Sequence, residues 1–209
     1  MIRCGRFLLI TVSCGLPILS SGCGGGNVAA PTSFAKYNAD NGDFAFEYPD
    51  GWDVSGFGKK NHVVKITKGG ATITVQSDLT GSLIGDIAGS AVTAMTGTVP
   101  GTGLDAEATE DLEPVAQVHQ MAQEAMAEEF GNYSEGEPEK VTPTLGNARM
   151  SEFTAKTGFG QEIRGIRATV LARDKRVVVI CTCSASNWEA LKPAFKKVIE
   201  SLQYGQAKT

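Results

Sequence analysis

Two closely spaced cysteines and two histidines are the side chains best suited to metal or redox chemistry. Cys181 and Cys183 flank Thr182, and His62 and His119 are the two histidines of the sequence. Zinc accepts such a ligand set. However, these residues come from three distant segments, and none shows the short spacing of a standard metal site. We therefore expect no metal, no other cofactor and no catalytic residues among them.

The sequence around Cys181 and Cys183 is typical of a buried strand. On a strand both side chains point to one face, about 6.6 Å apart along the chain, which disfavours a disulfide between them. In an oxidising compartment we expect free thiols to persist where they are buried, and buried thiols behave as small apolar groups. We therefore predict two core residues, whereas a redox or metal pair would require both to be exposed.

The two histidines have simple structural interpretations. His62 opens a predicted strand after two lysines, so we expect a polar residue at a strand edge. His119 lies beside Val118 and Gln120 in a predicted amphipathic helix, so we expect it at the solvent boundary of that helix. The chain carries no dinucleotide-binding glycine motif, no P-loop lysine and no calcium-binding loop motif.

Basic residues cluster around one pair of predicted strands. They are Arg164, Arg167, Arg173, Lys175 and Arg176. Such a patch on an acidic protein could face lipid headgroups or a carboxylate ligand. Charged residues also protect strand edges from aggregation, and we expect that role here, with the side chains in solvent.

Cys23 is the best candidate for a covalent modification. Residues 1–6 carry Arg3 and Arg6 and no acid, residues 7–19 are mostly apolar, and small residues lead up to the cysteine. This pattern predicts a secretory signal. It resembles a bacterial lipoprotein signal, which implies that Cys23 receives a diacylglycerol and becomes the first residue of the mature protein.

The lipoprotein pattern departs from the usual form at one position. Ser20 occupies the place three residues before Cys23 where an aliphatic residue is usual, and Leu19 is one residue further back. Processing at Cys14 would leave too short an apolar core. An ordinary signal peptide cut at a small residue and an uncleaved anchor remain alternatives, although residues 7–19 are shorter than the roughly 20 residues of a membrane span.

Composition limits the classes of partner. The chain has 19 basic and 23 acidic residues, and loss of the signal would make its net charge two units more negative than −4. Nucleic-acid binding requires a basic surface, so we exclude nucleic acid as a partner.

We divide the chain into a signal peptide at 1–22, a lipidated cysteine with a flexible spacer at 23–33, one globular domain at 34–205 and a tail at 206–209.

Hydrophobic periodicity predicts strands and helices in this domain. Expected strands are 44–48, 52–54, 62–67, 71–77, 149–157, 162–172 and 176–183. Residues 177–181 are apolar on both faces, which predicts a central strand. A helix is expected at 114–130, and a second helix, capped by Ser186 and Glu189 and interrupted by Pro193, should lie on the sheet. Residues 78–106, with a glycine-rich loop near 96–106, should form a mobile connection.

The domain resembles a known family. The segments 44–52, with an aromatic strand, proline, turn and tryptophan, 167–171 and 198–202 look like those of the PsbP-like α/β/α sandwich and of uncharacterised bacterial lipoproteins built on it. The resemblance implies an α+β fold in which an antiparallel β-sheet is flanked by helices. The family includes an accessory subunit of photosystem II and a regulator of a nuclear-transport GTPase, but no residue here carries over either role.

These observations predict a membrane-tethered lipoprotein that faces the periplasm, on either the cell membrane or the outer membrane of a bacterium. It would act as a non-enzymatic binding or accessory module for an unknown envelope protein. A small-ligand carrier or hydrolase, with a cleft covered by residues 78–106, is the alternative from another class. A purely structural envelope protein is a third.

Overall fold

The computed structural model describes residues 26–56, 63–79 and 113–207. Cys23, His62 and the glycine-rich segment 96–106 lie outside the described residues, and so do the predictions made for them. Among the described residues, no helix combines the length and the hydropathy needed to cross a membrane.

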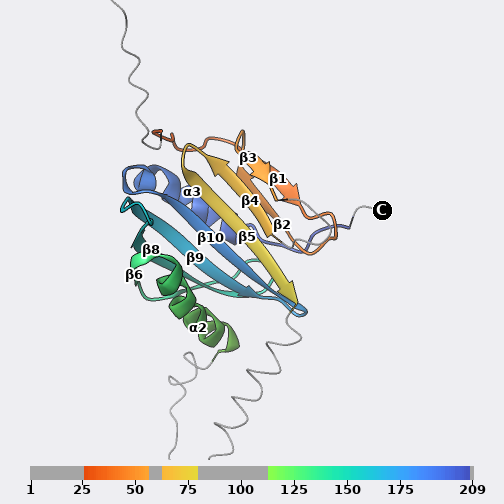
Figure 1. Cartoon of the computed structure of the whole chain (residues 1–209). Coiled ribbons are helices and arrows are strands. Elements are labelled where there is room, and N and C mark those ends of the chain that lie inside the picture. The colour runs from red at the N-terminus through yellow and green to blue at the C-terminus, as the bar shows by residue number, and fades with distance from the viewer. Residues whose placement is uncertain (1–25, 57–62, 80–112, 208–209) are drawn as a thin grey trace, which may run out of the picture.

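An eight-stranded antiparallel sheet forms the centre of the domain (Figure 1). Its strand order is β3-β4-β5-β10-β9-β8-β6, and β7 pairs with β8 beyond this path. The strands are β3 (Asp53–Ser55), β4 (Val63–Lys68), β5 (Ala71–Leu79), β6 (Gly131–Glu135), β7 (Glu139–Val141), β8 (Asn147–Lys156), β9 (Glu162–Leu171) and β10 (Lys175–Ser184). A separate two-stranded ribbon pairs β1 (Phe34–Asn38) with β2 (Ala45–Pro49).

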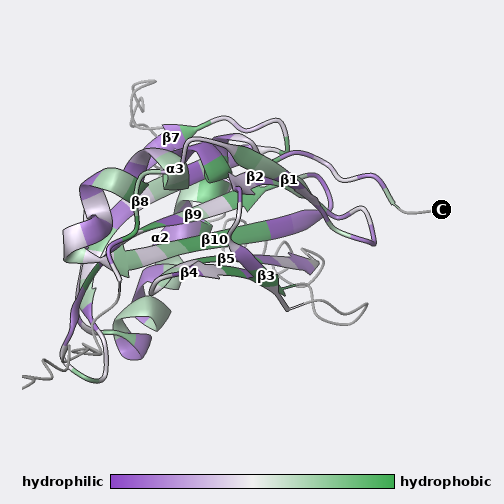
Figure 2. Cartoon of the chain, turned by 90° about the horizontal axis from the view of Figure 1, so that it is seen from above, coloured by the Kyte–Doolittle hydropathy of each residue, from purple (hydrophilic) through white to green (hydrophobic). Residues whose placement is uncertain are grey.

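Two helices cover opposite faces of the sheet. Helix α3 (Trp188–Glu200), which follows the short turn η2 (Ala185–Asn187), lies on one face beside β2, and helix α2 (Pro114–Glu129) lies on the other (Figures 1 and 2). Alternate residues of β9 show this arrangement. Ile166 and Ala168 are fully buried in the main core, whereas Arg167 points to the α2 side, where it binds His119.

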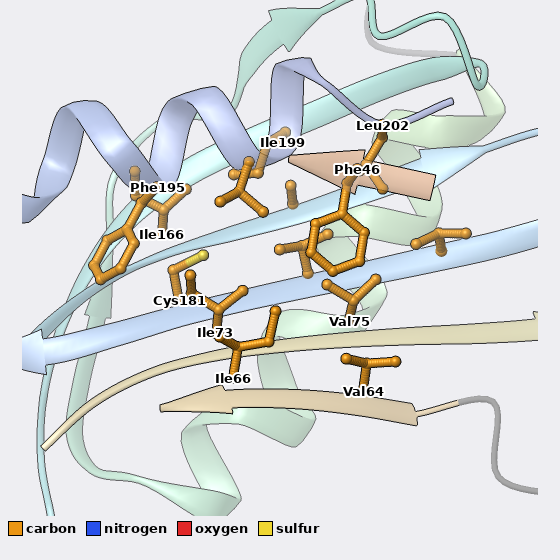
Figure 3. Packing of buried hydrophobic residues seen from close by; sticks show 14 of the residues in the cluster. Phe46, Val64, Ile66, Ile73, Val75, Ile166, Cys181, Phe195, Ile199 and Leu202 are labelled. Carbon is orange, nitrogen blue, oxygen red and sulfur yellow. The ribbon is translucent and has the colours of Figure 1, made fainter. Parts of the chain in front are cut away.

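The main core fills the space between the sheet, the β1–β2 ribbon and α3 (Figure 3). Large apolar side chains reach it from each of these parts because strands and the helix present one apolar face each. They include Phe46 of β2, Ile66 of β4, Ile73 of β5, Ile166 of β9, Cys181 of β10, and Phe195 and Ile199 of α3. A smaller cluster under the end of α2 contains Met126, Phe153 and Ala155.

The antiparallel α+β class is confirmed, and strand β10 is central as predicted. Val177, Val179 and Cys181 are fully buried on one face of β10. The opposite face is only half-buried at Val178 and Ile180, so the apolar run is not enclosed equally on both sides. The predicted strands agree with the observed ones within about two residues, whereas β1, β6 and β7 are additional.

Helix α3 corrects the predicted cap. The residue before the helix is Asn187, and no side chain caps its first turn. Ser186 lies in η2 and its hydroxyl contacts that of Ser184 at 3.0 Å. The chain enters the helix through a 3-10 turn, so Ser186 is too early to cap it. Pro193 lies inside α3 without ending it.

The packed domain begins before residue 34, the boundary predicted from the sequence. Val28 is buried, and its backbone N–H donates to Asn187 Oδ1 at 3.2 Å. The Asn187 Nδ2 group donates in turn to the carbonyl of Gly26 at 3.2 Å. Gly26 and Val28 therefore lie against the start of α3, whereas most of residues 29–33 are exposed.

Candidate functional site

A polar pocket of about 560 Å³ lies between helix α2 and the strands at the β6 to β9 side of the sheet. Its wall includes Gln120 and Gln123 of α2, Glu135 of β6, Lys140 of β7, Arg149 of β8 and Arg167 of β9. A volume of this size is typical of small-molecule sites, and several charged groups converge on it. It is therefore the strongest candidate site in the described part of the chain.

His119 lies under this pocket in a fully buried hydrogen-bond chain. Its Nε2 atom is 2.8 Å from Ser151 Oγ, and its Nδ1 atom is 3.0 Å from Thr169 Oγ1. Ser151 donates its hydroxyl proton to Glu135, because a carboxylate accepts only. Ser151 must then accept from Nε2–H, which makes Nδ1 the acceptor for the Thr169 hydroxyl. The hydrogen bonds thus assign the neutral Nε2–H tautomer to His119.

The position of His119 corrects the prediction of a solvent-boundary residue. The imidazole is 0 % exposed. His119 is four residues after Val115 and seven before Met126, and all three face the sheet. This spacing was a usable sequence signal, since residues four apart share one face of a helix.

Arg167 and Glu135 form a buried, two-pronged ion pair beside His119. Arg167 Nε donates to Glu135 Oε1 at 2.9 Å, and Nη2 donates to Oε2 at 3.0 Å. The remaining Nη1 donates to the backbone carbonyl of His119 at 2.8 Å. This two-pronged geometry gives both buried charged groups hydrogen-bond partners inside the fold. Arg167 is 1 % exposed, so the prediction that it belongs to a solvated basic patch is wrong.

The surroundings of His119 keep it neutral. Burial, together with the positive charges of Arg167 and Arg149, lowers the pKa of His119 to about 3. Glu135 lies 3.6 Å from Nε2, but its charge is already engaged by Arg167. At neutral pH the imidazole therefore serves as a hydrogen-bonding link between α2 and the sheet.

A second cluster of charged side chains, Glu113, Lys140 and Arg149, lies at the rim of the pocket. Lys140 and Arg149 are directly opposite each other on β7 and β8. Glu113, just before α2, lies 3.1 Å from Lys140 Nζ and 3.1 Å from Arg149 Nη2. The hydrogen bond from Lys140, with a smaller contribution from the charge of Arg149, lowers the pKa of the Glu113 carboxyl. The single carboxylate of Glu113 is thus shared between two cations.

Arg149 is incompletely paired although it is buried. Its side chain is 8 % exposed, and Nη1 has no hydrogen-bond partner within the described residues. Glu113 Oε2 also makes no hydrogen bond there despite its closeness to Nη2. The guanidinium is therefore not engaged in the forked geometry that Arg167 shows with Glu135.

The rest of the predicted basic cluster is divided among separate contacts. Lys175 is buried and lies 3.3 Å from both Asp43 and Asp174. Arg176 pairs with Asp78 at 2.8 Å, and Arg164 stacks over Trp188 at 4.6 Å from the ring centre. Arg173 is exposed as predicted. These residues do not form one basic surface.

The cysteines behave as core residues, as predicted. Cys181 and Cys183 are both free and both buried. Burial raises the pKa of the Cys181 thiol, and it raises that of Cys183 to about 11. Both thiols therefore stay protonated at neutral pH. In the described ranges, no group of three or more potential ligand side chains is arranged to hold a metal ion.

Ser151 has the partners of an activated hydroxyl but not its access. A nucleophilic serine needs a base and a place beside it for the substrate. His119 and Glu135 flank the hydroxyl, yet Ser151 is 2 % exposed and does not line the pocket. The network of Thr169, His119, Ser151, Glu135 and Arg167 therefore connects α2 to the sheet. His119, Glu135 and Arg167 also line the pocket, together with Lys140, Arg149 and the two glutamines.

Comparison with known proteins indicates the fold. No protein-family model matches the chain, and no curated protein matches it. Among solved structures, cyanobacterial PsbP (CyanoP) from Synechocystis sp. PCC 6803 is 15% identical, with a TM-score of 0.54, over 88% of this chain and 98% of that one. LpqN of Mycobacterium tuberculosis, described as involved in cell envelope biogenesis, is 12% identical, with a TM-score of 0.50, over 83% and 92%. The chain thus has a PsbP-like fold.

Proposed function

We propose that this protein is a lipid-anchored accessory domain that faces the periplasm and binds an envelope partner. Cys23 would carry the acyl chains, and the domain would act by binding rather than by catalysis. Two or more acyl chains hold a protein on a bilayer, whereas one chain binds only reversibly. The chemistry of the site is consistent with this role, because Ser151 does not line the pocket and burial keeps His119, which does line it, neutral.

The observation that carries this proposal is the short distance between Cys23 and the packed domain. Gly26 is held by Asn187 and Val28 is buried, so packing starts three residues after the proposed attachment site. Three residues span at most about 11 Å when fully extended. An acylated Cys23 would therefore hold the end of the domain near Gly26 close to the membrane surface.

The environment of Gly26 supports an orientation in which this end of the domain would face the bilayer. A groove of about 510 Å³ runs along residues 26–33 and is bounded by Asp50, Trp52, Lys68 and Gly69. These residues belong to the turns after β2 and between β4 and β5. The pocket under α2 lies on the opposite face of the sheet from α3 and would remain open toward a partner in the periplasm.

The structural neighbours support an envelope setting. LpqN is described as involved in cell envelope biogenesis, and this chain covers 92% of its length. The shared fold alone does not define a partner, because one fold hosts many functions. The proposal therefore rests on the signal sequence and the short link to the domain, with the neighbour as additional support.

Fractionation of wild-type and variant cells tests the anchor. We expect the wild-type protein in the membrane fraction, with an intact mass that shows a diacylglycerol on Cys23, and native mass spectrometry of the gently extracted protein should show a bound partner protein. Cys23→Ser should abolish acylation, whereas Cys14→Ser is the matched control and should leave it unchanged. A wild-type mature protein without lipid would overturn the proposal.

A small-ligand carrier is the second candidate function, and the pocket under α2 is the observation that favours it. Turnover of a substrate by the purified protein, lost on mutation of a pocket residue, would instead favour a hydrolase and would contradict the accessory role.

A further inference from the structure

We propose that the pocket under α2 is a binding site for a small carboxylate ligand, with Arg149 as its principal contact. This inference goes beyond the proposed function, since it concerns the domain alone and does not depend on the lipid anchor. It rests on the arrangement of charge around the pocket, on the incomplete pairing of Arg149 and on the polar groups that α2 presents at the rim.

Three neighbouring strands place cations on the same face of the sheet. Lys140 of β7, Arg149 of β8 and Arg167 of β9 all line the pocket. Lys140 and Arg149 are direct cross-strand partners, an arrangement of like charges that destabilises a sheet unless an anion lies between them. Glu113 supplies one such anion at the rim.

The charges at the pocket do not balance. Glu135 is fully engaged by Arg167, and Glu113 is shared between Lys140 and Arg149. His119 is neutral, so it adds no charge at physiological pH. Among the residues that the structure describes, three cations therefore face two carboxylates, and the remaining single positive charge matches a monoanion. A carboxylate has this charge, whereas a phosphate group carries more negative charge near pH 7.

Arg149 is the group with unused binding capacity. Its buried Nη1 has no hydrogen-bond partner among the described residues, which is costly for a charged group inside a protein. A planar guanidinium accepts a carboxylate through two parallel hydrogen bonds. A ligand carboxylate that entered beside Glu113 would contact the guanidinium of Arg149. It would then lie between Lys140 and helix α2.

Helix α2 provides neutral polar groups at the opening. Gln120 and Gln123 line the pocket and are exposed to solvent. Their side-chain amides can donate hydrogen bonds to a carboxylate or accept them from the rest of a ligand. The pocket walls thus combine a charged contact with adaptable polar groups, as small-molecule sites do.

Titration of the purified full chain with sodium acetate, followed by NMR of backbone amides and arginine Nε–H groups, tests the site. We expect saturable shifts at Arg149, Lys140, Gln120 and Gln123, with binding in the millimolar range, against sodium chloride at equal ionic strength. Arg149→Gln should weaken binding about tenfold or more, because it removes charged hydrogen bonds. Arg176→Gln is the matched control, since Arg176 lies on the same sheet but pairs with Asp78 outside the pocket, and it should bind acetate normally.

A second pair of variants tests the site without touching its buried charges. Gln123→Glu adds a carboxylate at the exposed rim and should weaken acetate binding by repulsion. Ala125→Glu adds the same charge at an exposed position on another face of α2 that does not line the pocket, and it should have no such effect. Equal NMR shifts with sodium chloride and with sodium acetate would overturn the proposed site. Acetate-induced shifts that persist unchanged in both Arg149→Gln and Gln123→Glu would also overturn it.

Inorganic phosphate provides the competing ligand class. Phosphate that binds more weakly than acetate at the same residues would support a carboxylate site, whereas phosphate that binds about tenfold more tightly would overturn the carboxylate assignment. Cys23→Ser protein should give the same result as the wild type, so failure of the anchor and failure of the pocket can be told apart.

Discussion

The neutral state of His119 depends on its surroundings. The imidazole is fully buried, and the guanidinium groups of Arg167 and Arg149 disfavour a further positive charge. Ser151 and Thr169 satisfy both ring nitrogens in the neutral form. The residue therefore stabilises the contact between α2 and the sheet only while it remains unprotonated.

The lowered pKa of His119 should make the stability of the fold depend on pH. The folded-state pKa is about 3, whereas a histidine in the unfolded chain titrates near 6.5. Below about pH 6.5 the unfolded chain binds a proton that the folded chain rejects, so the free energy of unfolding should fall as the pH falls toward 3, by at most about 1.4 kcal/mol per pH unit. The stabilisation is fully present above about pH 6.5.

Urea unfolding at pH 5 and pH 7 measures this effect. His119→Gln keeps polar atoms but removes the titrating group, so its stability should change less between the two pH values than that of the wild type. The NMR shift of the His119 Cε1–H group in the wild type provides a check that needs no variant. A titration midpoint near 6.5 in the folded protein would contradict the expectation.

The thiols of Cys181 and Cys183 should be inert in the folded protein. Their raised pKa values leave almost no thiolate at pH 8, and both side chains are buried. Iodoacetamide labelling followed by peptide mapping should modify neither residue under native conditions and both after denaturation. Rapid native labelling of either cysteine would show that this strand is accessible.

Among the elements, helix α2 is attached to the sheet by few apolar side chains. Val115 and Val118 anchor its start, and Met126 packs in the small cluster with Phe153 and Ala155 near its end. Between them the contact is the polar network of His119. The position of α2 therefore depends on both kinds of contact, and the pocket beside it depends on that position.

Removal of Met126 should loosen this end of the helix. Met126→Ala deletes a buried side chain and should lower the free energy of unfolding by about 2 kcal/mol or more, measured by denaturant unfolding. Met121→Ala is the matched control, because Met121 lies on the same helix and is 66% exposed. Equal effects of the two substitutions would contradict the observed packing of α2.

At the scale of the whole molecule, the N-terminal segment is part of the fold. Val28 packs into the main core, and Asn187 binds the backbone on either side of Asn27, at the carbonyl of Gly26 and the N–H of Val28. Because Asn187 is also the residue that precedes α3, the start of the domain and the start of its last helix are coupled.

Asn187→Ala should release this segment. The Val28 amide loses its acceptor in the variant, so its hydrogen exchange should become about tenfold faster or more, as expected for loss of one buried hydrogen bond. Asn41→Ala, which removes a local and exposed hydrogen bond to Asp43, is the matched control. Unchanged exchange at Val28 in Asn187→Ala would show that apolar packing alone holds the segment.

Local periodicity was sufficient for much of the architecture. Alternation in β5, β9 and β10 and the apolar stripe of α3 were readable because each element must bury one face. The strands β1, β6 and β7 were missed, since most of their residues are exposed or half-buried and give little apolar alternation. The spacing of His119 from Val115 and Met126 indicated the buried face of α2, but the polar partners of His119 and Arg167 could not be predicted, because they lie more than 30 residues away in the sequence.

The sequence by itself determined most of the strands, both helices and the two core cysteines, because these follow from the spacing of apolar residues along each element. Its resemblance to the PsbP-like family implied the antiparallel α+β arrangement. Only the tertiary structure decided which polar side chains meet. Strand register places Lys140 opposite Arg149 and Arg167 opposite Ser151. The packing of α2 on the sheet then brings His119 into contact with Ser151. Charge interactions depend on distance in space and on burial, and neither quantity is encoded in sequence spacing.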